Sequence, residues 1–178
     1  MQTFIALLRG INLGNHYKMK MPELKTMFEN LGFVSVRTYL QSGNVVFTSP
    51  DTDISSLETK IEAAILEKFG YVVPTLIRAP ADLQRIVDAN PFPDRTISNP
   101  IQPYVIFLKT LPIIRELELP DSEPAEHVFG ELELFVHYPN GSHVSKLSSN
   151  FVERKLKTTA SSRNWRTVLA LLEMSQQN

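Results

Sequence analysis

The chain has 178 residues, of which 43% are hydrophobic and 21% are charged, so it can form one large or two small packed domains. Its formal net charge of −1 gives no overall attraction to nucleic acid or to acidic membranes. The sequence contains no cysteine, which excludes disulfides, thiolate nucleophiles and cysteine-ligated metal centres.

Hydropathy along the chain indicates a cytoplasmic protein. No apolar run approaches the roughly 20 residues that a membrane-spanning helix needs. The N-terminus lacks the basic flank and the cleavage site of a signal peptide. We therefore expect no membrane association and a cytoplasmic location.

The first eighty residues predict the order β-α-β-β-α-β. Short β-rich runs at 4–9, 34–40, 44–48 and 74–78 alternate with helical patterns at 22–31 and 54–69. Pro22 suits the first helical turn, Asp53 suits the cap of the second helix, and Gly70 suits its end. This is the split βαβ or ferredoxin-like arrangement. We expect one antiparallel sheet with both helices on the same face.

The rest of the chain reads as a second, modified unit of the same kind. A helix from Pro80 and a loop up to Pro103 precede a strand at 104–109, and an acidic segment that is helical or irregular follows. Strands are predicted at 126–129 and 132–137, and a turn is predicted at Asn140-Gly141. Helical patterns run through Val144, Leu147, Phe151 and Leu156, and then from Trp165 to Leu172, with no obvious closing strand.

These patterns predict an α+β protein of two ferredoxin-like (split βαβ) units in tandem with an extra C-terminal helix. The predicted domains are residues 1–80 and residues 81–178. Trp165 lies on an apolar stripe of the last helix, so we expect it to be buried.

Charge is distributed unevenly along the sequence. Residues 1–48 contain five Lys or Arg and two acidic residues, whereas residues 116–133 contain seven acidic residues and no Lys or Arg. Residues 141–178 again contain six Lys or Arg and two Glu. Such blocks commonly form solvated faces. Alternatively, the two basic segments converge on one anion-attracting cleft.

The motif RGINLG at residues 9–14 lies between the first predicted strand and the first predicted helix. Glycines there let the backbone turn, and the helix N-terminus that follows favours negative charge. Lys18 and Lys20 can add positive charge, although Pro22 removes one N–H donor. The spacing matches neither the P-loop nor the dinucleotide-binding fingerprint. The motif therefore fits an anion site or a loop whose glycines only permit turning.

The motif QSGN at residues 41–44 places neutral hydrogen-bonding groups at the junction of two predicted strands. Amide side chains donate and accept hydrogen bonds, which suits recognition of a polar ligand. The alternative is a hairpin stabilised by its own Ser and Asn side chains.

The segment SSRNW at residues 161–165 begins the last predicted helix, where a serine can act as the cap. Arg163 and Asn164 can face either solvent or a ligand. The alternative is a capped helix with Trp165 as an anchor.

Together, the motifs at residues 9–14, 41–44 and 162–167 resemble a widespread bacterial family known as domain of unknown function 1697. The resemblance runs nearly end to end and implies two tandem ferredoxin-like units. It implies no activity, because the family has no established function.

The remaining polar residues favour neither a metal site nor a hydrolase. His16, His127, His137 and His143 show no metal-ligand spacing. Ser42 is not in a G-x-S-x-G elbow. We expect no metal and no cofactor.

The function class that the motifs favour is a cytoplasmic protein that binds an anionic or nucleotide-like ligand in a cleft between the two units. Arg9 and Lys18 would supply charge, Asn12, Gln41, Ser42 and Asn44 would orient the ligand, and Arg163 with Asn164 would clamp it. Two alternatives remain open: a metal-independent enzyme that uses the same cleft, and a homo-oligomeric interaction module in which the motifs are structural. The net charge does not support nucleic acid as a partner, and the sequence sets neither the oligomeric state nor whether the protein is an enzyme.

Overall fold

The computed structural model describes residues 1–95 and 101–177. These residues form two compact units. The first unit comprises Met1–Gln84 together with the chain from Leu171 onward, and the second comprises Arg85–Ala170. The loop predicted up to Pro103 includes residues 96–100, which lie outside the described residues.

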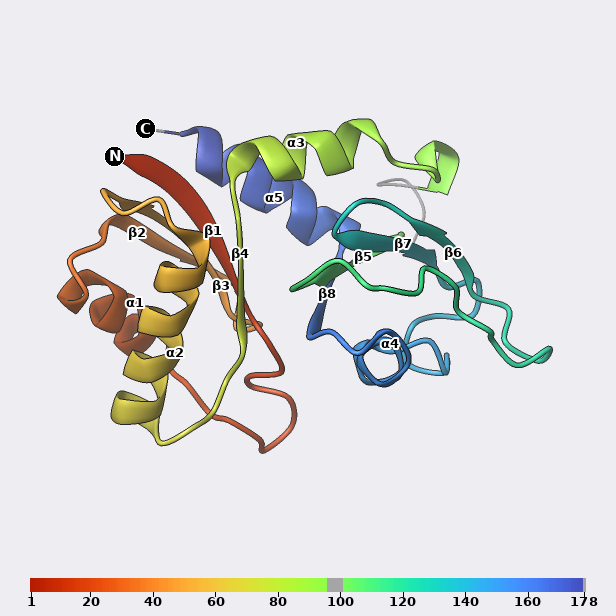
Figure 1. Ribbon diagram of the computed structural model, residues 1–178, viewed down its shortest axis with the longest axis horizontal. Coiled ribbons are helices and arrows are strands. Elements are labelled where there is room, and N and C mark those ends of the chain that lie inside the picture. The colour runs from red at the N-terminus through yellow and green to blue at the C-terminus, as the bar shows by residue number, and fades with distance from the viewer. Residues whose placement is uncertain (96–100, 178) are drawn as a thin grey trace. The chain divides into compact units, whose positions relative to one another are not determined.

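The described residues form strands and helices in an alternating order (Figure 1). In chain order they are β1 (Gln2–Leu8), α1 (Met21–Asn30), β2 (Val34–Tyr39), β3 (Asn44–Ser49), α2 (Ile54–Phe69), β4 (Thr75–Arg78), α3 (Pro80–Asp88), a single 3₁₀ turn (Pro93–Arg95), β5 (Tyr104–Leu108), β6 (Glu126–Phe129), β7 (Glu133–His137), α4 (Ser149–Leu156), β8 (Ala160–Asn164) and α5 (Trp165–Gln176).

The first unit contains a four-stranded antiparallel sheet in the order β2-β3-β1-β4. Strand β1 pairs with β3, which places Phe4 opposite Phe47, and with β4, which places Ala6 opposite Ile77. The β-α-β-β-α-β order and the single antiparallel sheet predicted from the sequence are confirmed.

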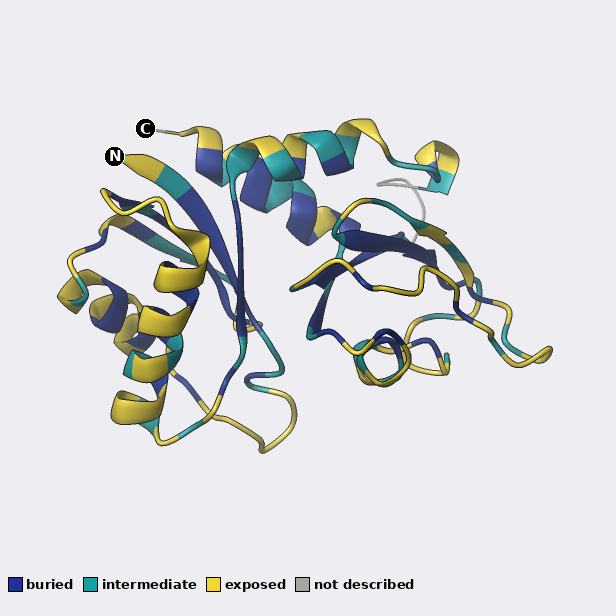
Figure 2. Cartoon of the chain, in the orientation of Figure 1, coloured by how far each residue is buried: buried dark blue, intermediate teal, exposed yellow. Residues whose placement is uncertain are grey.

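Helices α1 and α2 pack on the same face of this sheet, as predicted (Figure 1). Side chains of a strand alternate between faces, so Phe4 and Phe47 share the face that meets the helices. Phe28 of α1 and Ile61 of α2 belong to the same buried cluster, and the rings of Phe28 and Phe47 meet edge to face with centroids 5.5 Å apart. Figure 2 shows that β3, β4 and most of β1 are buried, while the outer sides of the helices are exposed.

The ends of α2 follow the signals in the sequence. The Asp53 carboxylate accepts hydrogen bonds from the backbone N–H groups of Ser55 and Ser56, which caps the helix start. Gly70 ends the helix with φ +74°, a left-handed conformation that a side chain would disfavour. The predicted boundaries of this helix are therefore confirmed.

The second unit contains a four-stranded antiparallel sheet in the order β6-β7-β5-β8. Val105 of β5 lies opposite Phe135 of β7 on one side and Arg163 of β8 on the other. If the strands of each unit are numbered one to four along the chain, both sheets have the order 2-3-1-4. The α+β class is confirmed, with two four-stranded sheets.

Strand β8 corrects the sequence-based expectation that the second sheet has no closing strand. Its sequence, ASSRN, has no β-branched or aromatic residue, so its intrinsic strand preference is weak. All five residues nevertheless pair with β5. The last helix consequently begins at Trp165, and its cap is Asn164 rather than a serine, because the Asn164 side-chain oxygen accepts from the Thr167 N–H at 2.9 Å.

Helix α4 is shorter than the apolar pattern suggested. It begins after Ser148, whose hydroxyl accepts a hydrogen bond from the Phe151 N–H. Val144 and Leu147 lie before the helix, so their assignment to the helical stripe was wrong; Val144 is exposed, whereas Leu147 is buried. Trp165, in contrast, is buried, as predicted. Within the described part of the chain, no helix is long and apolar enough to cross a membrane.

Candidate ligand-binding site

The turn between β2 and β3 is held together by its own polar side chains. Asn44 is fully buried, and its amide nitrogen donates to the Tyr39 carbonyl at 2.9 Å and to the Ser42 hydroxyl at 3.0 Å. Gly43 has φ +78°, and a β-carbon there would lie 2.7 Å from Cβ of Leu8. The turn therefore requires glycine at this position. The side chains of Asn44 and Ser42 stabilise it by hydrogen bonds.

Asn12 fixes the loop that leads from β1 to α1. Its side-chain oxygen accepts from the Met19 N–H at 2.8 Å, and its nitrogen donates to the Met19 carbonyl at 3.0 Å. The same nitrogen donates to the Gln41 carbonyl at 2.8 Å. Asn12 adopts φ +55°, which asparagine tolerates better than most residues. Its amide thus joins the loop to the β2–β3 turn, so the motifs at residues 9–14 and 41–44 lie side by side.

The two joined segments and the start of α1 line an open pocket of about 610 Å³, called the loop pocket below. Three of its lining residues, Asn12, Lys18 and Gln41, are among the site residues that the sequence predicted. The others are Met19, Lys20, Met21, Pro22 and Glu23.

Positive groups dominate the charge of the loop pocket. Lys18 is exposed, and Nζ of Lys20 lies 3.4 Å from a carboxylate oxygen of Glu23, with 82% and 49% of the two side chains exposed. Lys20 is also the N-cap residue of α1, and its side chain makes no capping hydrogen bond. The first turn of the helix therefore presents its positive end to the pocket without a side-chain cap.

The remaining predicted residues of the first unit do not line the loop pocket. Arg9 is half-buried at the end of β1, where its backbone N–H donates to the Pro74 carbonyl. Ser42 is exposed, while Asn44 lies below the turn in the sheet. The hydrogen bond from Asn44 to Ser42 lies within the hairpin turn. That Arg9, Ser42 and Asn44 contact a ligand stays a prediction.

The predicted residues of the second unit are engaged in local contacts. Arg163 is buried, and its guanidinium donates to the Ser161 hydroxyl at 2.8 Å and to the Ser162 carbonyl at 2.7 Å. Loss of solvation lowers the pKa of Arg163 to about 10. Asn164 caps α5. That Arg163 shares a site with Arg9, Asn12, Gln41 and Asn44 stays a prediction.

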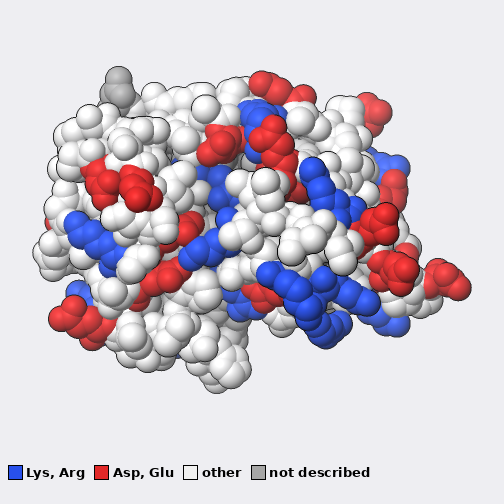
Figure 3. Space-filling view, in the orientation of Figure 1, with Lys and Arg blue, Asp and Glu red and all other residues white. Residues whose placement is uncertain are grey.

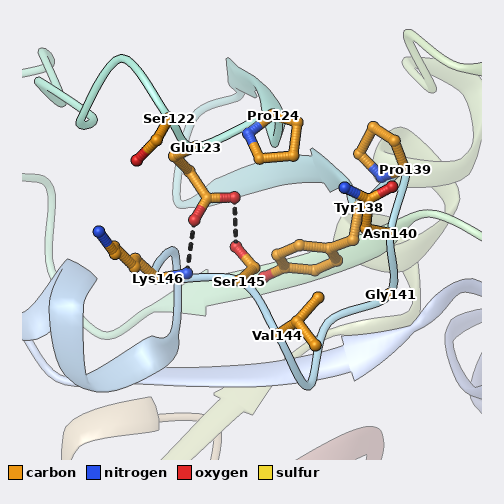
Figure 4. A pocket seen from close by; sticks show the side chains of 10 residues that line it. All are labelled: Ser122, Glu123, Pro124, Tyr138, Pro139, Asn140, Gly141, Val144, Ser145 and Lys146. Atoms are coloured by element: carbon orange, nitrogen blue, oxygen red, sulfur yellow. Dashed lines mark hydrogen bonds between the residues drawn. The ribbon is translucent and has the colours of Figure 1, made fainter.

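The second unit has a smaller pocket of about 250 Å³ beside the Tyr138 ring (Figure 4). In it, the Glu123 carboxylate accepts from the Ser145 hydroxyl at 2.8 Å and from the Lys146 N–H at 2.6 Å. Burial opposes ionisation of this carboxyl, but the hydrogen bonds from Lys146, Ser145 and Ala125 outweigh it and lower the pKa of Glu123. A carboxylate held in its charged form is a weak general base. The hydrogen bonds of Glu123 therefore favour a structural role, in which its side chain joins two loops, over catalysis; this joining side chain is called the Glu123 clip below.

Other ion pairs in the second unit join elements of the fold to one another. The Arg85 guanidinium binds both oxygens of the fully buried Glu133 carboxylate, at 2.8 and 2.9 Å. Arg95 contacts Glu126 and His137. Among the described residues, no group of three His, Asp or Glu side chains is placed to hold a metal ion.

Sequence reasoning missed part of the loop pocket. Met19 and Met21 were not candidates, because nothing in a methionine side chain marks it as part of a polar site. Glu23 was not a candidate either, because an acidic side chain does not attract an anion. A usable signal was present, since a basic residue at an N-cap position leaves the helix start without the oxygen acceptor that usually occupies it.

The fold and the loop pocket define an α+β protein with two four-stranded antiparallel sheets and a basic pocket beside the first of them. The chain belongs to the family described as "Protein of unknown function (DUF1697)", whose model matches residues 1–135. The match includes every residue of the loop pocket, whereas the motif at residues 162–167 lies beyond it. No curated protein matches the chain.

A solved structure with a similar fold is that of conserved bacterial protein SP0830 from Streptococcus pneumoniae. The two chains are 24% identical, with a TM-score of 0.72, and the similarity covers 98% of each chain. The likeness is one of fold, and it extends beyond the residues that the family model matches.

Proposed function

We propose that the protein binds a small anionic ligand in the loop pocket. The observation that carries this proposal is the start of α1, which opens into the pocket without a side-chain cap and is flanked by Lys18 and Lys20. Helix N-termini bind phosphate and carboxylate groups because their first N–H groups lack intrahelical partners and the helix dipole favours negative charge. An anion would act as the missing cap.

The apolar lining supports an organic anion rather than a simple ion. Met19 and Met21 contribute flexible, polarisable side chains, which adapt to the shape of a bound group. Gln41 can donate and accept hydrogen bonds at the rim. A phosphate- or carboxylate-bearing molecule with an apolar or aromatic body, such as a nucleotide-like compound, matches this combination.

Binding is a better match to the loop pocket than catalysis. Its titratable lining residues are Lys18, Lys20 and Glu23, and all three are exposed. A metal-independent enzyme would need a nucleophile or a general base beside a partner that activates it. The described lining residues include no serine, threonine, histidine or tyrosine. Catalysis by a metal-independent enzyme is therefore the less favoured of the two functions.

Backbone amide chemical shifts during a titration with inorganic phosphate, and separately with adenosine monophosphate, test this proposal. We expect saturable shifts at the amides of Met21 and Glu23. The double variant Lys18→Gln/Lys20→Gln should weaken binding at least about tenfold, because a hydrogen bond to a charged group contributes roughly 1.5–3 kcal/mol. Binding of the nucleotide but not of phosphate would identify the organic body as the dominant contact.

Two single variants on the same helix sharpen the test. Lys25→Gln removes an exposed charge that pairs with Glu29 outside the pocket, so it should leave binding unchanged. Glu23→Gln removes the carboxylate that competes for Lys20 and should strengthen binding. Shifts scattered away from the pocket, or equal binding by the double variant and the wild type, would overturn the proposal.

A further inference from the structure

An apolar loop on the second unit protrudes into solvent immediately after β5. Leu111, Ile113 and Ile114 are 65%, 102% and 62% exposed. Single exposed aliphatic side chains are common on protein surfaces, but three within four residues form a patch, and such patches mark interaction sites. This segment, Leu111 to Ile114, is called the apolar loop below.

The apolar loop is anchored on both sides and in its middle. Before it, the Thr110 N–H donates to the Thr158 hydroxyl at 3.0 Å. Within it, Pro112 is buried. After it, the Arg115 guanidinium donates to the Gly130 carbonyl and lies over the Phe129 ring, 5.7 Å from the ring centroid. The backbone is thus held in place while the aliphatic side chains point outward, which lowers the entropic cost of docking.

Negative charge follows the apolar loop directly. Glu116, Glu118 and Asp121 are exposed, and residues 116–133 contain no Lys or Arg. Figure 3 shows acidic side chains over the end of the second unit that carries this β5–β6 connection, with basic side chains beside them. A surface complementary to this segment should therefore combine an apolar floor with a basic rim.

The loop pocket of the first unit has this combination. Met21 and Pro22 provide accessible apolar surface, Met19 is buried beside them in the lining, and Lys18 and Lys20 provide positive charge. Next to it, Leu13 and Tyr17 are 62% and 41% exposed, which extends the apolar area beyond the pocket itself.

We propose that the protein self-associates head to tail, with the apolar loop of one copy docked in the loop pocket of a second copy. The acidic residues that follow the loop would pair with Lys18 and Lys20 of that copy. Because the two surfaces differ, the contact is heterologous and continues from copy to copy until it closes into a ring or forms longer chains.

This contact uses the pocket of the proposed function but does not depend on a ligand. An anion in the pocket and the apolar loop exclude each other, so each weakens the binding of the other by the same factor.

Sedimentation velocity of the full chain over a range of protein concentrations tests self-association. We expect assemblies larger than a monomer at high concentration and fewer of them at high salt, since exposed charge pairs are screened. Ile113→Asp should weaken association at least about tenfold, because it replaces an aliphatic side chain that docking would bury. Val144→Asp changes another exposed aliphatic residue of the same unit and should have no effect. Circular dichroism checks that each variant is folded.

Mixing two defective variants gives the sharper test. Ile113→Asp retains a normal loop pocket, and Lys18→Glu/Lys20→Glu retains a normal apolar loop. Neither should associate alone, but an equimolar mixture should form a heterodimer and nothing larger, since it has one working contact. A monomeric wild type at all concentrations, or a mixture that stays monomeric, would overturn the proposal.

Phosphate titration of the monomeric Ile113→Asp variant tests ligand binding separately, so failure of one proposal is distinguishable from failure of the other.

Discussion

The connection from β1 to β2 and the connection from β5 to β6 occupy equivalent places in the two sheets but are built differently. The first contains a loop and the ten-residue helix α1, which buries Leu24, Met27 and Phe28 against the sheet. The second, residues 109–125, contains no helix, and it reaches its own core through Leu117 and Ala125.

Polar side chains also fasten each connection. Asn12 bonds the first loop to Met19 and to the β2–β3 turn, and Glu123 bonds the second to Ser145, Lys146 and Ala125. The same strand order therefore does not require a helix between the strands. It requires a connection with a few buried apolar anchors and a polar clip, and a connection without a helix leaves more of its apolar side chains exposed.

The largest difference between the two connections should appear when their apolar anchors are truncated. Phe28→Ala removes a fully buried ring that contacts Phe33 and Phe47, with centroids 5.8 and 5.5 Å away. Truncation of a buried phenylalanine costs about 3–5 kcal/mol, because a large cavity remains. Urea unfolding followed by circular dichroism measures this loss. A cost below about 1 kcal/mol would show that α1 contributes no more than the irregular connection does.

Leu117→Ala should cost less, about 2 kcal/mol, at the low end of the range for leucine truncation. Leu117 is buried at the edge of the second core, in an irregular segment that can move to fill the space. Fluorescence of Trp165, the only tryptophan, reports unfolding of the second unit. A loss as large as that of Phe28→Ala would mean that the irregular connection is as well packed as the helix.

The polar clips should contribute less than the apolar anchors. Asn12→Ala removes two donated hydrogen bonds and one accepted one, and it places alanine at φ +55°. We expect a loss of about 1–2 kcal/mol, since a net hydrogen bond contributes roughly 1 kcal/mol and the exposed groups regain water. Asn12→Gly removes the same bonds without the backbone strain, so the difference between the two variants measures the strain minus the extra entropy that glycine gives the unfolded chain.

The apolar parts of the fold were predictable from the sequence because they repeat with a period. The helical pattern at residues 22–31 predicted α1, and the residues that α1 buries, Leu24, Met27 and Phe28, follow that spacing. Asp53 and Gly70 predicted the ends of α2 because capping is a local interaction. Strand β8 was not predictable in this way. Arg163 and its neighbours become a strand only by pairing with β5, which lies more than fifty residues earlier in the chain.

The candidate site was predictable only in part, for a similar reason. Gly10, Asn12 and Gln41 lie at the ends of elements, where local composition signals a turn, and the sequence therefore predicted candidate residues in the two loops that line the pocket. The sequence could not show that the Asn12 amide would form hydrogen bonds with Met19 and Gln41. A side-chain hydrogen bond across 29 residues has no local signal. It also could not show that Lys20 would leave the helix uncapped.

The smallest expected effect is the pH-dependent contribution of the Glu123 clip. Its folded-state pKa is lowered, so the stabilisation is fully present above the unfolded-state value of about 4.3 and is lost as the pH falls through the folded-state pKa. Glu123→Gln retains the size of the side chain but cannot ionise. The difference in unfolding free energy between wild type and variant should therefore be constant near neutral pH and shrink below about pH 4.3. Urea unfolding followed by Trp165 fluorescence over a series of acidic pH values measures it. Asn12→Ala, which removes no ionisable group, should show a constant difference over the same pH values when unfolding is followed by circular dichroism, which also reports the first unit. A Glu123→Gln difference that did not shrink would mean that the clip acts through shape and neutral hydrogen bonds, as the Asn12 clip does.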